Sequence, residues 1–189
     1  MGAVTVSFTD TGPDNANSLP FSIDGLDFTV STNPGGRVDQ APLGLGARGP
    51  QGAGNNQEGR RLAGTEFLLF TFSQPILLSS IGFVEFNAGE EIAALLVNGS
   101  TDPIVLTLAQ QGGEDLGGND SRQTFSPDAL AGVVIQTLQI SSSPVDLNGN
   151  SGIRIAGFEA EIVPLPAPIV LVLTAFAVLG YWGRRSKAA

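Results

Sequence analysis

Apolar residues between positions 1 and 162 recur at every second position or in short continuous runs, which Gly, Pro, Asn and Asp separate. Val, Ile, Thr and Phe are frequent within the runs, as is typical of β-strands. No part of this region has the period of an amphipathic helix, and residues 126–131 can form at most one helical turn. We expect strands at residues 3–9, 26–32, 66–73, 76–86, 92–97, 104–109, 122–125, 133–141 and 153–163.

Many short strands separated by turn residues favour an all-β fold, an antiparallel β-sandwich with a jelly roll as the expected topology. Residues 1–162 are enough for one hydrophobic core, so they are expected to form a single domain. Residues 66–73 and 76–86 are the most apolar segments before residue 163 and should form the centre of that core. Pro75 cannot donate to a strand ladder, so residues 73–75 are expected to turn the chain between these two strands as a hairpin.

Residues 33–65 are rich in Gly and poor in strand-forming residues, which predicts a long surface loop within the domain. Most basic residues of the body lie in this segment, where they could fold back on the acidic body or contact an acidic polymer. They are Arg37, Arg48, Arg60 and Arg61.

Residues 163–189 have a different pattern. A Pro-rich segment precedes an almost uninterrupted apolar run at residues 169–182, and Arg184, Arg185 and Lys187 follow it. At about 1.5 Å per residue the run makes a helix of about 21 Å, shorter than the roughly 30 Å hydrocarbon core of a bilayer. It therefore spans a membrane only together with its flanks, with the basic cluster in the cytoplasm and the body outside.

The order of these parts resembles the PEP-CTERM sorting tail of Gram-negative bacteria in its VPLPA variant. The motif residues are Val163, Pro164, Leu165, Pro166 and Ala167. The resemblance implies that the inner membrane holds the chain until an exosortase cuts near the motif and releases the body. The alternative is a membrane-anchored surface protein that is not cleaved. Residues 1–8 lack the basic and apolar regions of a signal peptide, so we expect the export signal to precede them.

The body also resembles a group of PEP-CTERM ectodomains. In these a Gly- and Asn-rich stretch, here residues 44–64, precedes a Glu-apolar-Phe-Thr-Phe strand, here residues 66–72. A Gln-Pro step and the text Leu-Ser-Ser-Ile-Gly-Phe follow, here at residues 74–75 and 78–83. The resemblance implies a sandwich and no activity.

Composition excludes several classes of chemistry. The chain has no His and no Cys, so thiolate nucleophiles, Ser-His-Asp triads, disulfides and zinc sites built on these ligands are impossible. All 18 Asp and Glu residues precede position 163, and the formal net charge of the chain is −9. Nucleic acid is not expected as a partner, because phosphate binding requires clustered Lys and Arg.

Paired carboxylates are the remaining basis for catalysis. Glu90 and Glu91, like Glu114 and Asp115, are adjacent in Gly-flanked turns. Successive residues of a strand point to opposite faces, so neither pair naturally converges on a glycosidic bond as glycoside hydrolysis requires. We expect solvated turns at both pairs and a protein that is not an enzyme.

Two clusters offer the oxygen ligands that calcium prefers. They are Asp10, Asp14, Asn15 and Asn17 after the first expected strand, and Asp146, Asn148 and Asn150 before the last. The second cluster begins like an EF-hand loop but has Ser151 and Gly157 where that loop needs Gly and Glu. A structural calcium and plain Asx turns are both compatible with these residues, and no other cofactor is expected.

The sequence predicts a non-enzymatic, exported protein of the cell surface or extracellular matrix, with an inner-membrane intermediate. Its expected partners are an exosortase-type protease, the inner membrane and exopolysaccharide. The alternative is a carbohydrate-binding jelly-roll module, although Tyr181 and Trp182 lie in the tail and leave only Phe in the body for stacking on sugars. Asn98 to Ser100 fit the N-glycosylation pattern and, more simply, a hairpin turn between residues 92–97 and 104–109.

Overall fold

The computed structural model describes residues 2–8, 16–41, 44–48, 62, 66–84, 92–106, 122–143 and 153–164. Within these residues the chain forms antiparallel strands and one short 3₁₀ helix, η1, so the prediction of an antiparallel all-β body is confirmed. The elements are β1 (Ala3–Ser7), β2 (Ser18–Ile23), β3 (Leu26–Thr32), β4 (Arg37–Ala41), β5 (Gly44–Arg48), β6 (Phe67–Val84), β7 (Ile92–Val97), β8 (Ile104–Leu106), β9 (Arg122–Phe125), η1 (Asp128–Leu130), β10 (Val134–Ser143) and β11 (Arg154–Ile162).

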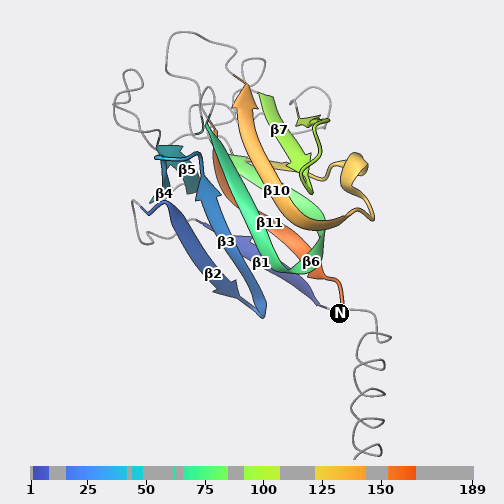
Figure 1. Cartoon of the computed structure of the whole chain (residues 1–189). Coiled ribbons are helices and arrows are strands. Elements are labelled where there is room, and N and C mark those ends of the chain that lie inside the picture. Colours follow the sequence, from blue (N-terminus) through green and yellow to red (C-terminus); the bar gives the residue numbers. More distant parts are fainter. Residues whose placement is uncertain are drawn as a thin grey trace, which may run out of the picture.

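The long strand β6 organises the sheet, because its two parts have different neighbours. Residues 67–72 lie between β3 and β10. Residues 76–84 pair with β11 on one side, and on the other side residues 76–77 pair with β10 and residues 81–84 pair with β9. The hydrogen-bonded order is β4-β5-β11-β6-β10-β7-β8, with β2 added to β3 and β1 added to β11. The sheet folds over at β6 into two facing layers, and Figure 1 shows β2, β3, β10 and β7 in front of β1 and β11.

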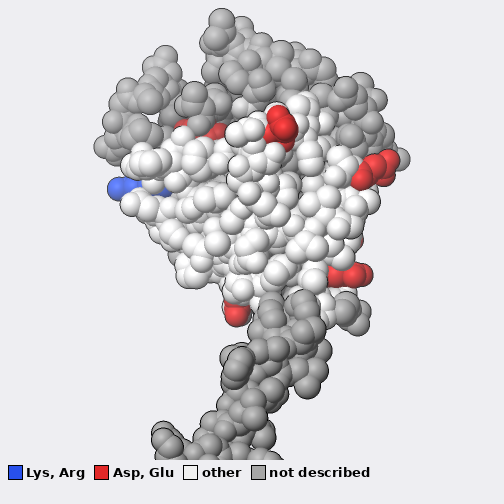
Figure 2. Space-filling view, turned by 45° about the vertical axis from the view of Figure 1, so that its right-hand side comes forward, with Lys and Arg blue, Asp and Glu red and all other residues white. Residues whose placement is uncertain are grey.

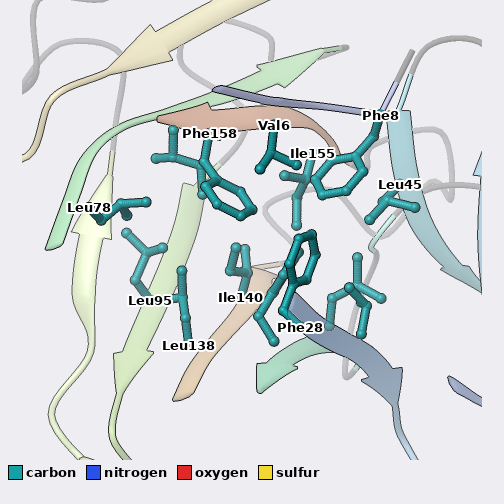
Figure 3. Packing of buried hydrophobic residues seen from close by; sticks show 14 of the residues in the cluster. Val6, Phe8, Phe28, Leu45, Leu78, Leu95, Leu138, Ile140, Ile155 and Phe158 are labelled. Atoms are coloured by element: carbon teal, nitrogen blue, oxygen red, sulfur yellow. The ribbon is translucent and has the colours of Figure 1, made fainter. Parts of the chain in front are cut away.

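The core lies between the layers and is rich in Phe. Phe158 of β11 meets Phe28 of β3 and Phe70 of β6, with ring centroids 5.6 and 6.0 Å away. Figure 3 shows side chains of the two layers meeting in this space. Phe70 is only 1% exposed, and residues 67–72 and 76–84 contribute many of the buried side chains, so the predicted centre of the core is confirmed for the described residues.

The predicted hairpin at residues 73–75 is wrong, because β6 continues through this segment. Residues 72–75 lie opposite Gln136 alone, where the register with β10 shifts. The side-chain amide of Gln136 donates to the Phe72 carbonyl, and the Val163 amide donates to the Pro75 carbonyl at 2.9 Å. Pro75 therefore sits in a bulge, where its missing N–H costs no ladder bond.

The predicted loop at residues 33–65 is wrong for residues 37–41 and 44–48, which pair with each other as β4 and β5. Leu45 of β5 pairs with Ile155 of β11. Gly44 has φ 143°, and a Cβ at this position would lie 2.6 Å from the Ile155 carbonyl oxygen. Glycine thus lets β5 approach β11, and tertiary pairing overrides the low strand propensity of the segment.

Strand β2 is an unexpected element, because Pro20 interrupts its apolar pattern. Among the described strands β2 pairs with β3 alone, and such an edge position tolerates a proline. Asp24 and Gly25 connect the two strands with φ values of 49° and 83°. Both positive values match a two-residue type I′ turn, which Asp-Gly favours.

The described residues contain no helix that is long and apolar enough to cross a membrane. The expected membrane helix at residues 169–182 lies outside the described residues. The jelly-roll topology stays a prediction.

Candidate functional site

The outer face of β2, β3 and the first part of β6 is hollowed into an open groove of about 550 Å³. This volume is within the range of small-molecule sites, about 300 to 1,000 Å³. The groove is lined by Pro20, Phe21, Ser22, Asp27, Phe28, Thr29, Thr71, Phe72 and Ser73.

Strand alternation divides the lining residues into two sets. Phe21, Phe28 and Phe72 belong to the core side, where the rings of Phe21 and Phe28 stack with centroids 5.1 Å apart. The others belong to the outer face, where their side chains are exposed or half-buried: Pro20, Ser22, Asp27, Thr29, Thr71 and Ser73. The surface of the groove is therefore mostly apolar, and the small polar groups of its outer side chains are set into it above an aromatic core.

The strand register lines up the outer side chains. Thr29 lies opposite Thr71, and Thr71 lies opposite Thr137, so three threonines form a row across β3, β6 and β10. The Ser73 hydroxyl donates to the Asp27 carbonyl oxygen at 2.8 Å and joins β6 to β3 two residues beyond Thr71. Backbone hydrogen bonds between β3, β6 and β10 fix the positions of the three threonines.

Several polar groups of the groove keep their full hydrogen-bonding capacity. In the described part of the chain, the hydroxyls of Ser22, Thr29 and Thr71 bond to no protein group. Each hydroxyl offers one donor and two acceptor positions, and the Asp27 carboxylate offers two acceptor oxygens. The groove can thus donate to and accept from a ligand that carries hydroxyl groups.

The groove is nearly uncharged. Among the described residues that line it, Asp27 is the single charged one. Figure 2 shows a largely white described surface, on which the Asp and Glu side chains stand apart from one another. A ligand of this site is therefore expected to be neutral.

The predicted turn at Asn98 is confirmed, and its side chain has a structural role. β7 and β8 pair as a hairpin, and Asn98 and Gly99 have φ values of 51° and 73°. The Asn98 side-chain amide donates to the Val134 carbonyl at 2.8 Å, and its oxygen accepts from the amide of Gln136 at 2.7 Å and that of Thr137 at 3.1 Å. The nitrogen that a glycan would use is engaged at the β10 bulge, which opposes the glycosylation interpretation.

The predicted sorting motif begins where the described sheet ends. β11 ends at Ile162, and the Val163 amide makes the 2.9 Å bond to Pro75. Pro164 follows and is exposed. Leu165, Pro166 and Ala167 lie outside the described residues, as do the basic residues Arg184, Arg185 and Lys187.

The predicted calcium ligands lie almost entirely outside the described residues. Among the described residues no group of three or more His, Cys, Asp or Glu could hold a metal ion. Asn17 is exposed beside β2, while the other residues of the two calcium candidates lie outside the described residues: Asp10, Asp14, Asn15, Asp146, Asn148 and Asn150. The carboxylate pairs at residues 90–91 and 114–115 also lie outside them.

Sequence reasoning missed the groove, because it missed β2. The Asp24-Gly25 pair between two period-two segments was the signal that could have found this strand. No short-range signal in the sequence could predict that β3 pairs with β6, since the paired residues are about 40 positions apart.

Comparison of the chain with protein-family models, with curated proteins and with solved structures gives no match. The interpretation of the groove therefore rests on its own geometry and chemistry.

Proposed function

We propose that the chain is a non-enzymatic, exported protein of the cell surface or extracellular matrix. Residues 169–182 hold it in the inner membrane with the body outside the cytoplasm, and an exosortase-type protease releases it by cutting within residues 163–167. One observation above all others supports a separate body and tail: the last described strand ends at Ile162, directly before the proposed sorting motif.

The position of the motif suits proteolytic release. A protease binds its substrate as an extended chain, and a residue in a paired strand is not available for this. Pro164 has no N–H and is exposed, so it stands free of the sheet edge. A cut after Pro164 leaves the whole of β11 in the body, whereas a cut within β11 would remove buried residues such as Ala160.

The proposal that the body is not an enzyme rests on composition, because a chain without His and Cys lacks the commonest general bases and nucleophiles. The two facing antiparallel layers support a jelly roll as the topology of the body. The acidic body fits a role among neutral matrix components rather than on nucleic acid.

Intact-mass analysis of the protein released from cells tests the proposal. We expect a C-terminus within residues 164–167, and we expect the double variant Pro164→Ala/Pro166→Ala to stay with the membrane. The matched control is Pro103→Ala, which changes an exposed proline in the turn between β7 and β8. Released protein that still carries Trp182 would refute processing, and equal release of the double variant would refute the role of the motif.

A further inference from the structure

We propose that the groove on β2, β3 and β6 binds a segment of a neutral polysaccharide. The proposed function supplies the setting in which such a polymer is met, and this inference rests on it in that respect alone. The chemistry of the site stands on the residues that line the groove.

The lining matches the two kinds of surface that a sugar presents. Sugar hydroxyls can donate to the Asp27 carboxylate and exchange hydrogen bonds with the hydroxyls of Thr29 and Thr71, which have no protein partner in the described part of the chain. The apolar C–H groups of a sugar can pack on the threonine methyl groups and on the ring of Pro20, which is exposed. A ligand without hydroxyl groups would leave these polar groups unpaired on desolvation, at a cost in affinity.

Charge selects a neutral polymer over an acidic one. The described lining residues include no Lys or Arg, and the one charged group among them is the Asp27 carboxylate. An anionic polysaccharide would meet this carboxylate and a chain of net charge −9 without a compensating cation in the groove. Repulsion therefore disfavours uronic acids and sulfated sugars at this site.

Shape indicates an internal segment of a chain rather than a terminal sugar. The groove is open, and the threonine row continues beyond it to Thr137 of β10. Leu69, Gln139 and Leu96 lie side by side in the adjacent row of the same face. A polymer can follow these rows across the strands, whereas a closed pocket would be needed to enclose a chain end.

The affinity should be low, because the described lining residues offer no fully exposed aromatic ring for stacking. Phe28 and Phe72 are buried in the core, and the half-buried ring of Phe21 is stacked on Phe28. A few hydrogen bonds in an open, solvated groove give a Kd of about 10⁻⁴ to 10⁻³ M for an oligosaccharide. Binding to a long polymer would be strengthened by many copies of the repeating unit.

The test uses the full chain in a detergent without a sugar headgroup, so that the detergent does not compete. Cellohexaose, maltohexaose, laminarihexaose and mannohexaose are the neutral probes, and a hexamer of mannuronic acid is the anionic probe. Titration is followed by NMR or calorimetry. We expect at least one neutral hexaose to bind with a Kd of about 1 mM or lower, and the hexuronate to bind more weakly.

Three variants locate the binding. Thr29→Val and Thr71→Val remove a hydroxyl while keeping the shape and strand propensity, and each should weaken binding about five- to tenfold. Asp27→Asn should also weaken neutral binding while reducing the discrimination against the hexuronate. The matched control is Thr124→Val, an exposed threonine in β9 beside the second part of β6, which should bind as the unchanged protein does.

Several outcomes would overturn the proposal. They are no binding of any neutral hexaose at about 5 mM, tighter binding of the hexuronate, or an equal effect of Thr124→Val. A tighter binding of the hexaose on dilution, in step with the dissociation of a dimer, would assign the face to a second copy of the chain instead. The assay uses uncleaved protein, so failed binding leaves the processing proposal intact, and failed processing leaves the binding result intact.

Discussion

The two faces of β3 and of the first part of β6 differ in what their side chains do. On the inner face Phe28, Phe70 and Phe72 form a network of ring contacts with Phe158 across the core. On the outer face Thr29 and Thr71 make no side-chain hydrogen bond within the described part of the chain. Packing in the core accounts for the inner residues. The hydroxyls of the two outer residues have no structural role in the described part of the chain.

This difference makes the outer face the better source of functional inference. A buried aromatic residue is selected by packing, so its presence says little about a ligand. The threonine hydroxyls face a groove and bond to no protein group in the described part of the chain, so they are available to another molecule. The comparison predicts that substitutions on the two faces separate stability from binding.

The largest effect is expected at the core. Phe70→Ala removes a ring that is 1% exposed and should lower the free energy of unfolding by about 3 to 5 kcal/mol. The matched control is Phe67→Ala in the same strand, where the ring is half-buried on the outer face and should cost about 1 kcal/mol. Urea unfolding of the full chain followed by circular dichroism measures both, and equal losses would contradict the assignment of the two faces.

An intermediate effect is expected at Asn98, a polar residue that does have partners. Asn98→Ala loses the bonds to Val134, Gln136 and Thr137 and places alanine at φ 51°, so we expect a loss of about 2 to 3 kcal/mol. Asn98→Gly accommodates the same φ and should lose about 1 kcal/mol less. The same unfolding measurement compares them, and a loss below about 0.5 kcal/mol for both would show that the side chain does not hold the β10 bulge.

The smallest effect on stability is expected in the groove. The double variant Thr29→Val/Thr71→Val loses no protein hydrogen bond in the described part of the chain and keeps a high strand propensity, so its stability should stay within about 0.5 kcal/mol. A loss above about 1.5 kcal/mol would mean that the threonines serve the fold, and the comparison of the faces would then fail.

Sequence reasoning succeeded where the signal is local. The alternation of apolar and polar residues predicted β3, β7 and β9 with the bounds that the structure has. The apolar segment around Phe70 predicted the buried positions there. It failed where a local signal has two solutions. Pro75 suits a turn and equally a bulge, and the glycines before residue 48 suit a loop and equally a strand in close contact with β11.

The sequence by itself determined the class of the body, the chemistry that lack of His and Cys excludes, and the resemblance of the tail, because each depends on composition or on neighbours along the chain. Only the tertiary structure decided that β6 is shared by two layers and that Thr29, Thr71 and Thr137 stand in one row. The physical reason is that register and strand partner follow from packing between distant segments. A one-residue slip of β3 or β10 would leave the local pattern of the sequence unchanged and would remove the row.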